Sequence, residues 1–339
     1  MSDTSTELEF SKQLKKYETS IPGLIIFDLT VFGDNRGWFK ENWQREKMLA
    51  LGLPDFGPVQ NNFSFNGKRG TMRGIHAEPW DKFISVGSGS FFGAWVDIRE
   101  GSPTYGQTFT ATIDASKAIF VPAGVANSYL TLEDNVVYSY LVNDHWHPDA
   151  SYSFINATDP SLDIDWPIPP EEWEMSDKDK NHPMLKDAMS VKPKKVLVTG
   201  ANGQLGKALR KEFPDAEFVS REELDITNPD LRSLRHWRDY GTIINAAAYT
   251  AADKAESPEG RKAAWKANAT AVANLAKIAT EFGITLVHVS SEYVFDGTAE
   301  THDEDEELSP LGVYGQTKAA GDIAAGTAPR YYIIRTTWV

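Results

Sequence analysis

The chain contains no cysteine among its 339 residues. Disulfide bridges and thiolate metal sites are therefore excluded. No apolar run approaches the ~20 residues that a membrane-spanning helix requires, so we expect no membrane partner. Residues 1–16 are polar and lack the apolar stretch of a signal peptide, which favours a cytoplasmic protein.

Basic residues are in the minority, with 34 Lys and Arg against 48 Asp and Glu, for a net charge of −14. Nucleic acid is therefore not an expected partner, because its binding favours basic surfaces. An anionic ligand would need a local basic pocket. Lys68, Arg69 and Arg73, with Arg36 and Lys82 nearby in sequence, either supply such a pocket or are scattered solvated charges.

The length exceeds what one hydrophobic core usually organises, so we expect two domains. Residues 24–142 contain short apolar runs bounded by Gly, Pro, Asn and Asp, which predicts the closely spaced strands of a barrel or sandwich. Only residues 44–51 are predicted to be helical there. Residues 157–191 are rich in Pro, Asp and Trp, and we expect irregular structure that wraps the first domain.

Strand and helix patterns alternate in the second half, which predicts a parallel, doubly wound sheet. Residues 191–195 are predicted to be a linker between domains at 1–190 and 196–339. The predicted strands are 196–199, 218–219, 242–245, 285–290 and 331–335, and the predicted helices start at 204 or span 229–238 and 263–282.

Residues 200–206 (GANGQLG) directly follow an apolar strand pattern and precede a helical one. Glycines in this context permit a tight turn and let the backbone approach a pyrophosphate, which the positive end of the helix also attracts. A purely structural glycine turn is the alternative. Ala246, Ala247 and Ala248 follow the next strand of the predicted sheet, where small side chains leave room for a dinucleotide.

Tyr314 and Lys318 are four residues apart, so they would share one helix face. A nearby ammonium favours the phenolate and would lower the tyrosine pKa toward acid chemistry. The same spacing also occurs in ordinary surface pairs. Ser290 and Ser291 end a predicted strand, where a hydroxyl either polarises a carbonyl or caps a helix.

Several second-half strings resemble dTDP-4-dehydrorhamnose reductase, an extended short-chain dehydrogenase family. They are GANGQLG at 200–206, NAAAYT at 245–250, DKAE at 253–256, SSEYVFDG at 290–297 and YGQTK at 314–318. The resemblance implies a Rossmann-type fold in which Tyr314 donates a proton and Lys318 holds the nicotinamide ribose and tunes Tyr314. It also implies that Ser291, where the family usually has threonine, bonds the substrate carbonyl, and that Glu292 replaces an aspartate.

The same resemblance indicates the cofactor. Arg221 lies at the end of the second predicted strand, where a guanidinium could pair with a 2′-phosphate, so we expect NADPH rather than NADH. Family members continue for about as long again, and we expect residues 196–339 to lack the substrate lobe. The predicted cofactor-binding residues are Gly200, Asn202, Gly203, Gln204, Leu205, Gly206, Arg221, Asp225, Ile226, Ala246, Ala247, Ala248, Tyr314 and Lys318, of which Asp225 and Ile226 correspond to an adenine-contacting pair.

His76 is the candidate base of the first half. A solitary strand histidine is more often a packed core residue than a catalytic one. Tyr138 on another predicted strand, Lys82, and the carboxylates at 176–180 would add an acid, a cation and an orienting group. Such a set suits proton abstraction next to a carbonyl.

The first half resembles dTDP-4-dehydrorhamnose 3,5-epimerase, a family with a cupin-type β-barrel, or jelly roll. The matching strings are DNRGWFKE at 34–41, QNNFS at 60–64, GTMRGIH at 70–76, DIREGSPTYG at 97–106, DWP at 165–167 and SDKD at 176–179. The resemblance implies that His76 removes the C3 and C5 protons and that Asp179 orients it. Tyr138 would return a proton and Lys82 would stabilise the enolate oxygen.

The substrate contacts follow from the same resemblance. Arg36 and Arg73 would hold the diphosphate, and Gln60 and Asn62 would contact the nucleotide sugar, with no metal or cofactor in this half. Asn127 stands where the family has an active-site histidine, and Ala77-Glu78 replaces the usual Tyr-Gln. His145 and His147 could place two imidazoles on one strand face as a metal site, but no third ligand is evident.

Together these patterns predict a bifunctional enzyme of dTDP-L-rhamnose synthesis. It would epimerise dTDP-4-dehydro-6-deoxy-D-glucose and reduce its C4 ketone, and both families imply a homodimer. One alternative is a working epimerase with a non-catalytic dinucleotide-binding module, such as the regulatory subunit of methionine adenosyltransferase that the reductase family resembles. Another is an epimerase that acts at one carbon only, which Asn127 would permit.

Overall fold

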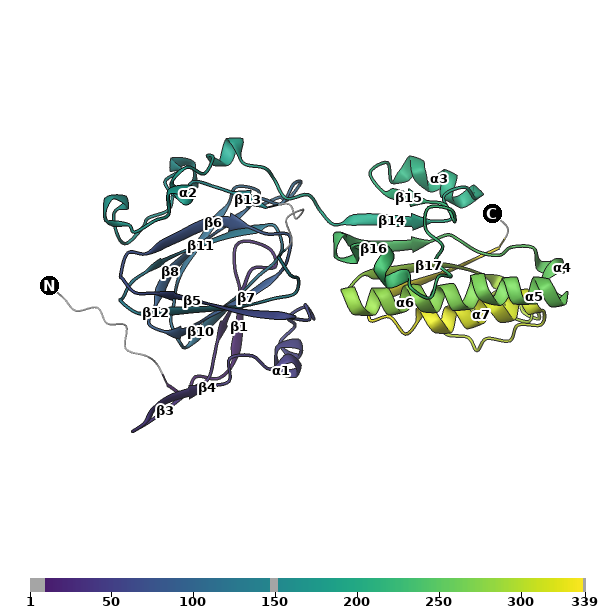
Figure 1. Ribbon diagram of the computed structural model, residues 1–339. Helices are drawn as coiled ribbons and strands as arrows, with labels where there is room; N and C mark the ends of the chain where they lie inside the picture. The colour runs from purple at the N-terminus through teal and green to yellow at the C-terminus, as the bar shows by residue number, and fades with distance from the viewer. Residues whose placement is uncertain (1–9, 147–151, 338–339) are drawn as a thin grey trace. The chain divides into compact units, whose positions relative to one another are not determined.

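The computed structural model describes residues 10–146 and 152–337 of the chain. They form two compact units, Met1–Pro193 and Lys194–Val339. The first is a β unit and the second an α/β unit, as the sequence predicted (Figure 1). No helix in the described ranges is both long enough and apolar enough to cross a membrane.

Two antiparallel sheets build the first unit. The six-stranded sheet has the order β1 (Lys15–Glu18), β2 (Ile25–Asp28), β10 (Lys117–Val121), β7 (Lys82–Ser88), β12 (Val136–Val142) and β5 (Gln60–Asn66). The five-stranded sheet has the order β13 (Ser153–Phe154), β6 (Met72–Ala77), β11 (Val125–Thr131), β8 (Phe91–Asp97) and β9 (Thr108–Ile113).

The inner faces of these sheets pack on each other. Ile84 and Tyr138 from the six-stranded sheet share one core cluster with Phe91, Trp95 and Tyr129 from the five-stranded sheet. Because side chains alternate along a strand, the register that pairs Tyr138 with Ser64 and Tyr140 with Asn62 places these four on one face of their sheet. The inner face therefore carries polar groups beside the apolar core.

The outer faces are covered by different segments. Helix α1 (Arg45–Ala50) buries Met48 against the six-stranded sheet, and Gln44 caps it by accepting a hydrogen bond from the Lys47 amide. Ile155, Leu162 and Ile168 pack on the five-stranded sheet. The wrapping segment that carries them contains η1 (Pro160–Leu162), η2 (Pro170–Glu172), α2 (Asp177–Lys180) and η3 (Leu185–Asp187), in line with the irregular structure predicted.

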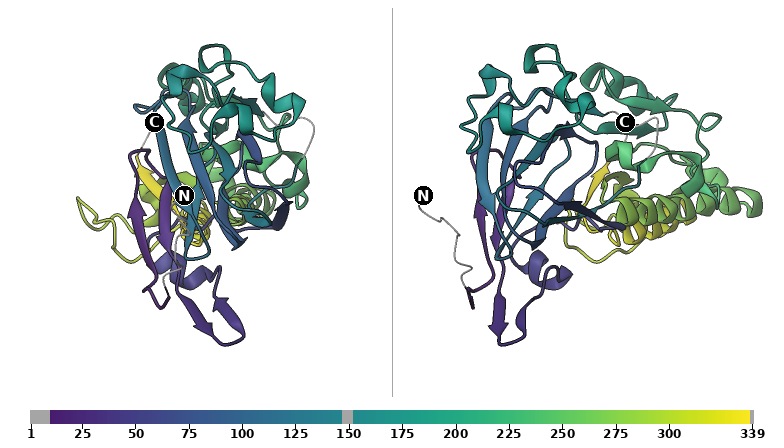
Figure 2. Two further views of the ribbon diagram at one scale, coloured as in Figure 1. Left: turned by 90° about the vertical axis from the view of Figure 1, so that its left-hand side faces the viewer. Right: turned by 60° about the vertical axis from the view of Figure 1, so that its left-hand side comes forward.

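A hairpin of β3 (Val31–Asp34) and β4 (Gly37–Lys40) extends from the body of the first unit (Figures 1 and 2). Phe32, Trp38 and Phe39 are exposed on it, which is unusual for aromatic side chains so close together.

The second unit is built on a parallel sheet of order β15 (Glu217–Val219), β14 (Lys195–Thr199), β16 (Tyr240–Asn245), β17 (Thr285–Ser291) and β18 (Tyr331–Thr336). Its α-helices are α3 (Gln204–Glu212), α4 (Ala252–Ala255), α5 (Pro258–Trp265), α6 (Ala271–Phe282) and α7 (Val313–Ala325). Leu197, Ile243 and Leu286 of the sheet pack against Val272 and Leu275 of α6. Each predicted strand is confirmed.

Residues 229–238 do not form the helix that was predicted. They form two 3₁₀ turns, η4 (Leu231–Leu234) and η5 (Trp237–Asp239). The buried indole of Trp237 donates to the carbonyl oxygens of Leu231 and Arg232, which are acceptors that a continuous helix would use. The Ser233 hydroxyl also bonds Asp230, a local contact that competes with helix formation.

The predicted helix at 263–282 starts earlier and is interrupted. Ser257 caps α5, and a π-helical turn η6 (Lys266–Thr270) joins α5 to α6. Asn268 in this turn is buried, accepts from the Tyr249 amide and donates to the Tyr249 carbonyl. A side chain that ties two segments in this way explains the local widening of the helix.

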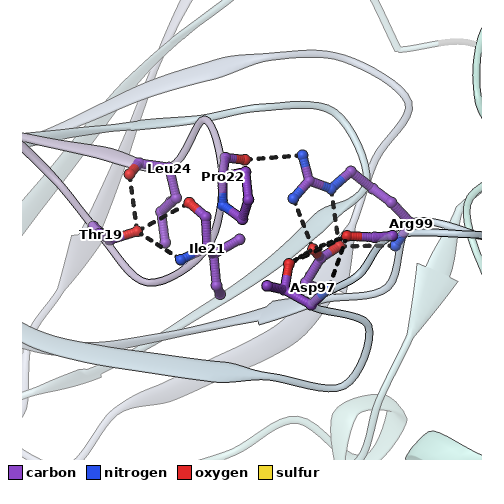
Figure 3. A network of polar contacts seen from close by, with 8 residues as sticks. Thr19, Ile21, Pro22, Leu24, Asp97 and Arg99 are labelled. Atoms are coloured by element: carbon purple, nitrogen blue, oxygen red, sulfur yellow. Dashed lines mark hydrogen bonds and ion pairs between the residues drawn. The ribbon is translucent and has the colours of Figure 1, made fainter.

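The carboxylate of Asp97, at the end of β8, is buried and binds side chains of the loop that follows this strand (Figure 3). Arg99 donates to both of its oxygens at 2.9 and 2.7 Å and also to the Pro22 carbonyl oxygen at 3.0 Å. Thr104 and Ser102 donate to the same carboxylate. Burial alone would raise the pKa of Asp97, but these hydrogen bonds bring it to about 2.

We predict that Asp97→Asn destabilises the first unit by about 2 kcal/mol at pH 7, the free energy that corresponds to this pKa shift. Because the folded-state pKa is depressed, this stability is present above pH ~4 and is lost as the pH falls toward 2. Native-state hydrogen exchange of the β8 amides measures the change. Asp55→Asn, at an exposed pair with Arg45, is the control and should cost less than about 0.5 kcal/mol. Equal losses in the two variants would contradict the prediction.

Candidate active sites

The imidazole of His76 and the carboxylate of Asp179 meet in the first unit. His76 lies on β6, and its Nε2 is 3.1 Å from Oδ1 of Asp179 on helix α2. Ser176 caps α2 by accepting from the Asp179 amide, and the Gly74 amide faces Oδ2 at 3.5 Å. Burial would raise the pKa of Asp179, but the hydrogen bond and charge of His76 lower it below its usual value. The ionised carboxylate assigns the proton to Nε2 and leaves Nδ1 of His76 as the basic atom.

Lys82 lies across the interior from His76 in a cluster of polar groups. Its buried Nζ is 2.5 Å from Oε2 of Glu78 and donates to Oδ1 of Asn127 at 2.8 Å. Asn127 is the register partner of His76 across β11 and β6, so their side chains share one face. The ammonium also lies 5.6 Å from the ring centre of Tyr140. Of the positions that depart from the epimerase pattern, 78 and 127 therefore both contact Lys82.

Tyr138 projects from β12 into the interior. Its ring stacks on Tyr129 at 4.2 Å and packs against Phe91 and Tyr140. Burial raises the pKa of Tyr138 well above its usual value, and the neighbouring tyrosines and Glu78 raise it further. The phenol therefore stays protonated at neutral pH and can donate a proton but cannot act as a base.

The inner face of β5 adds amide groups to this interior. Gln60 donates to Oδ1 of Asn62 at 2.8 Å, and Asn66 accepts from Nε of Arg73 at 3.1 Å. His145 also bonds Gln60, at 3.0 Å, whereas His147 lies outside the described residues. The sheets thus gather most of the substrate-binding residues predicted from the sequence.

Arg36 is not brought to this interior. It occupies the turn of the β3–β4 hairpin with 85% of its side chain exposed, and it pairs with Asp34. No hydrogen bond or ion pair among the described residues joins it to His76 or Lys82. Its role in holding a diphosphate stays a prediction.

A cavity of about 880 Å³ lies at the carboxyl end of the parallel sheet in the second unit. Its volume is in the range typical of ligand sites. Of the residues predicted to bind a cofactor, the cavity is lined by Gly200, Asn202, Gly203, Gln204, Leu205, Arg221, Asp225, Ile226, Ala246, Ala247, Ala248, Tyr314 and Lys318.

The glycine motif is shaped by close backbone contacts. Gly200 has a φ of +74°, and a Cβ there would lie 2.7 Å from the backbone of Ala246. Gly203 is the N-cap of α3. Gly206 does not line the cavity, since it is buried where a Cβ would strike the Gly200 carbonyl oxygen. The first glycine thus serves the turn, and the third serves helix packing.

Tyr314 and Lys318 share one face of α7 beside the cavity. Lys318 is 2% exposed, and its Nζ donates to the Val289 carbonyl oxygen at 2.7 Å. Burial lowers the pKa of Lys318 to about 8. The pKa of Tyr314 is raised by burial, which outweighs the lowering by its hydrogen bond with Ser291. The expected lowering of this pKa by Lys318 is therefore wrong for the unliganded site, because burial dominates.

Arg221 stands largely exposed at the cavity edge, with its Nε 4.0 Å from Asp225. Asp225 accepts from the amide and the hydroxyl of Thr227, which together with Arg221 lower the pKa of its carboxyl. Ser291 caps η7 (Glu292–Val294) and bonds Glu292 at 3.1 Å. Ser290 also lines the cavity, with its buried hydroxyl lacking a hydrogen-bond partner in the described ranges.

Sequence reasoning missed two buried histidines. His182 lies beside Asp179 in the first unit, with its Nε2 3.6 Å from Oδ1. In the second unit, Nδ1 of His288 forms a hydrogen bond of 3.1 Å with the side-chain nitrogen of Asn245. Burial lowers the pKa of His288 to about 3. The period-two burial along β17 was the available signal for His288, whereas nothing local distinguishes His182.

Each half of the chain matches a different family profile. The dTDP-4-dehydrorhamnose 3,5-epimerase profile matches residues 18–187, and the RmlD substrate binding domain profile matches residues 194–339. An RmlC homolog from Streptococcus pyogenes is 52% identical over 197 residues, which cover 56% of this chain and 98% of that protein.

Two further matches cover one half each. The structure of RmlC from Streptococcus suis in complex with dTDP-D-xylose has a TM-score of 0.51 and 52% identity, covering 54% of this chain and 97% of that one. The dTDP-4-dehydrorhamnose reductase of Mycobacterium tuberculosis is 37% identical over 163 residues, covering 44% of this chain. The match spans 52% of that reductase, about half of its length.

We predict that the stability of the second unit rises by about 3 kcal/mol between pH 7 and pH 10 because of Lys318. Its pKa is about 8 when folded and near 10.5 when unfolded, so the unfolded chain binds more protons in this window. The free energy of unfolding therefore increases with pH. Unfolding of the full chain and of Lys318→Met at both pH values, followed through the α6 amides, measures the effect. A rise of the same size in Lys318→Met would contradict it.

Proposed function

Because the chain belongs to the dTDP-4-dehydrorhamnose 3,5-epimerase family, we propose that it catalyses two consecutive steps of dTDP-L-rhamnose synthesis. The first unit, of cupin-type jelly-roll architecture, epimerises dTDP-4-dehydro-6-deoxy-D-glucose at C3 and C5. The second unit, of Rossmann type, reduces the C4 ketone with NADPH. The observation that carries the proposal is the His76–Asp179 pair, in a unit whose interior also holds Lys82 and Tyr138.

In the epimerisation, Nδ1 of His76 takes the proton from the carbon next to the ketone. The C–H electron pair moves into an enolate, whose oxygen the Lys82 ammonium stabilises. Asp179 stabilises the imidazolium that forms, since its Oδ1 accepts from Nε2. Tyr138, whose phenol points into the same interior, returns a proton to the opposite face. His76 then releases its proton to solvent and Tyr138 regains one from solvent, after which the same cycle at the second carbon completes the reaction.

Glu78 and Asn127 support this assignment of Lys82. A carboxylate oxygen at 2.5 Å and an amide oxygen at 2.8 Å fix the position of the buried Lys82 nitrogen in the interior. In the proposed site, Asn127 occupies the position of the family histidine and positions Lys82 through its amide oxygen.

The reductase half of the proposal rests on the cavity of the second unit. The Gly200–Ala246 approach and the free amides of α3 suit a pyrophosphate, and Arg221 at the edge suits a 2′-phosphate. Bound NADPH would supply the hydride. Tyr314 would hold and deliver the proton to the ketone oxygen, with Ser291 bonded to Tyr314 and Lys318 orienting the ribose.

Proton NMR in deuterated water, with the dTDP-4-dehydro sugar and no reduced cofactor, tests the epimerase. The full chain should lose both the C3 and the C5 proton signals, and His76→Gln should lower the exchange rate at least ~10³-fold, because the general base is removed. His236→Gln, an exposed histidine of the second unit, is the control and should exchange normally.

The number of signals lost distinguishes the alternatives. Loss of one signal only would replace the proposal with single-carbon epimerisation, and Asn127→His would then be expected to restore the second exchange. No exchange in the full chain would refute the catalytic roles of His76 and Tyr138.

Cofactor fluorescence tests the second unit. Arg221→Ala should weaken NADPH binding by roughly tenfold or more and leave NADH binding unchanged, because one charge-assisted contact to a phosphate is lost. Lys211→Ala, an exposed cation on α3 that does not line the cavity, is the control. Equal weakening of both cofactors would contradict the 2′-phosphate contact. NADPH binding without oxidation in the presence of the epimerised ketone would favour the non-catalytic module instead.

A further inference from the structure

A third titratable side chain adjoins the His76–Asp179 pair. His182 follows helix α2 directly, and its Nε2 lies 3.6 Å from Oδ1 of Asp179, the oxygen that His76 approaches at 3.1 Å. One ligand atom from each residue lies within 4.8 Å of the other two. Two imidazoles and a carboxylate thus converge from β6, α2 and the turn after α2.

The environment of His182 leaves its nitrogens available. The side chain is 8% exposed, stacks on Phe154 at 4.9 Å and meets the edge of His76 at 5.3 Å. Neither of its ring nitrogens makes a hydrogen bond of normal geometry within the described ranges, although the Ile155 backbone lies near the ring. A buried imidazole without such partners is rare and calls for an explanation.

We propose that His76, Asp179 and His182 form a binding site for a zinc-type divalent metal ion, and that the bound ion inhibits the epimerase. Two imidazole nitrogens and one carboxylate oxygen are a common zinc ligand set. Zinc bonds of about 2.0–2.1 Å separate neighbouring tetrahedral ligands by roughly 3.4 Å. The Nε2–Oδ1 separations of 3.1 Å for His76 and 3.6 Å for His182 bracket that value, and all three ligand atoms lie within 4.8 Å of one another. His76 is 32% exposed at its side chain, so an ion and its fourth ligand, water, can enter.

Inhibition follows from the tautomer of His76, and this step rests on the proposed function. Metal binding requires the lone pair of Nε2, the atom whose proton Asp179 now accepts. The proton that leaves Nε2 is taken up at Nδ1, so the net charge of the ring is unchanged. Nδ1 then carries a proton and can no longer abstract one from the sugar. Asp179, as a ligand, also ceases to stabilise an imidazolium.

Titration calorimetry of the full chain with Zn²⁺ and with Mg²⁺, after treatment with chelator, tests the site without reference to activity. We expect a zinc site that Mg²⁺ does not fill, because imidazole ligands disfavour Mg²⁺. In the NMR spectrum, zinc should perturb the imidazole signals of His76 and His182. His182→Gln and His182→Asn should each weaken zinc binding at least tenfold, with circular dichroism as the check on folding.

His145→Gln is the matched control, because His145 is an exposed histidine of the same unit and is not one of the three proposed ligands. Zinc affinity lost in His145→Gln, or retained in both His182 variants, would overturn the site. In the NMR exchange assay, zinc should slow C3 and C5 exchange at least tenfold in the full chain, and chelator should restore it. Zinc bound at the site without slower exchange would overturn the inhibition. No exchange even without zinc would refute the proposed function, while the calorimetric result would still decide the metal site.

Discussion

The Asp179 carboxylate is the constraint on which the first unit's site depends. It lies on a four-residue helix that could not persist alone in water, and it reaches a histidine 103 residues earlier in the chain. The helix is held by the Ser176 cap and by the wrapping segment packed on the outer face of the five-stranded sheet. The orientation of the His76 ring therefore depends on how the wrapping segment docks, and not on β6 alone.

Charge inside this unit is balanced locally. A buried ammonium is costly unless it is paired, and the Lys82 ammonium is paired with Glu78 and bonded to Asn127. Asn127, at the position where the epimerase family has a histidine, therefore contacts the Lys82 ammonium through its amide oxygen. Glu78 and Asn127 are far apart in the sequence, but both of these departures from the family pattern contact Nζ of Lys82.

In the second unit, the glycine motif allows backbone atoms, rather than side chains, to lie close to the cavity. Gly200 lets the first turn approach the strand end at Ala246, and Gly206 lets α3 pack on that turn. Beneath them, the Thr199 hydroxyl bonds Asn245, which in turn bonds His288, so adjacent strands are tied by buried polar contacts. A network of buried hydrogen bonds of this kind rigidifies the strand ends that carry it.

The sequence by itself indicated the two-unit organisation and the parallel sheet, because strand periodicity and glycine turns are recorded in neighbouring residues. The pairing of His76 with Asp179, which are 103 residues apart, was expected only from the resemblance to the epimerase family. Sequence reasoning failed at 229–238, where the Trp237 indole takes carbonyls that a helix would use. Only the tertiary structure decided that Glu78 meets Lys82, that His182 adjoins Asp179, and that burial raises rather than lowers the pKa of Tyr314. The contacts depend on how segments pack in the folded unit, and the pKa of Tyr314 depends on its burial there. No local sequence pattern encodes either.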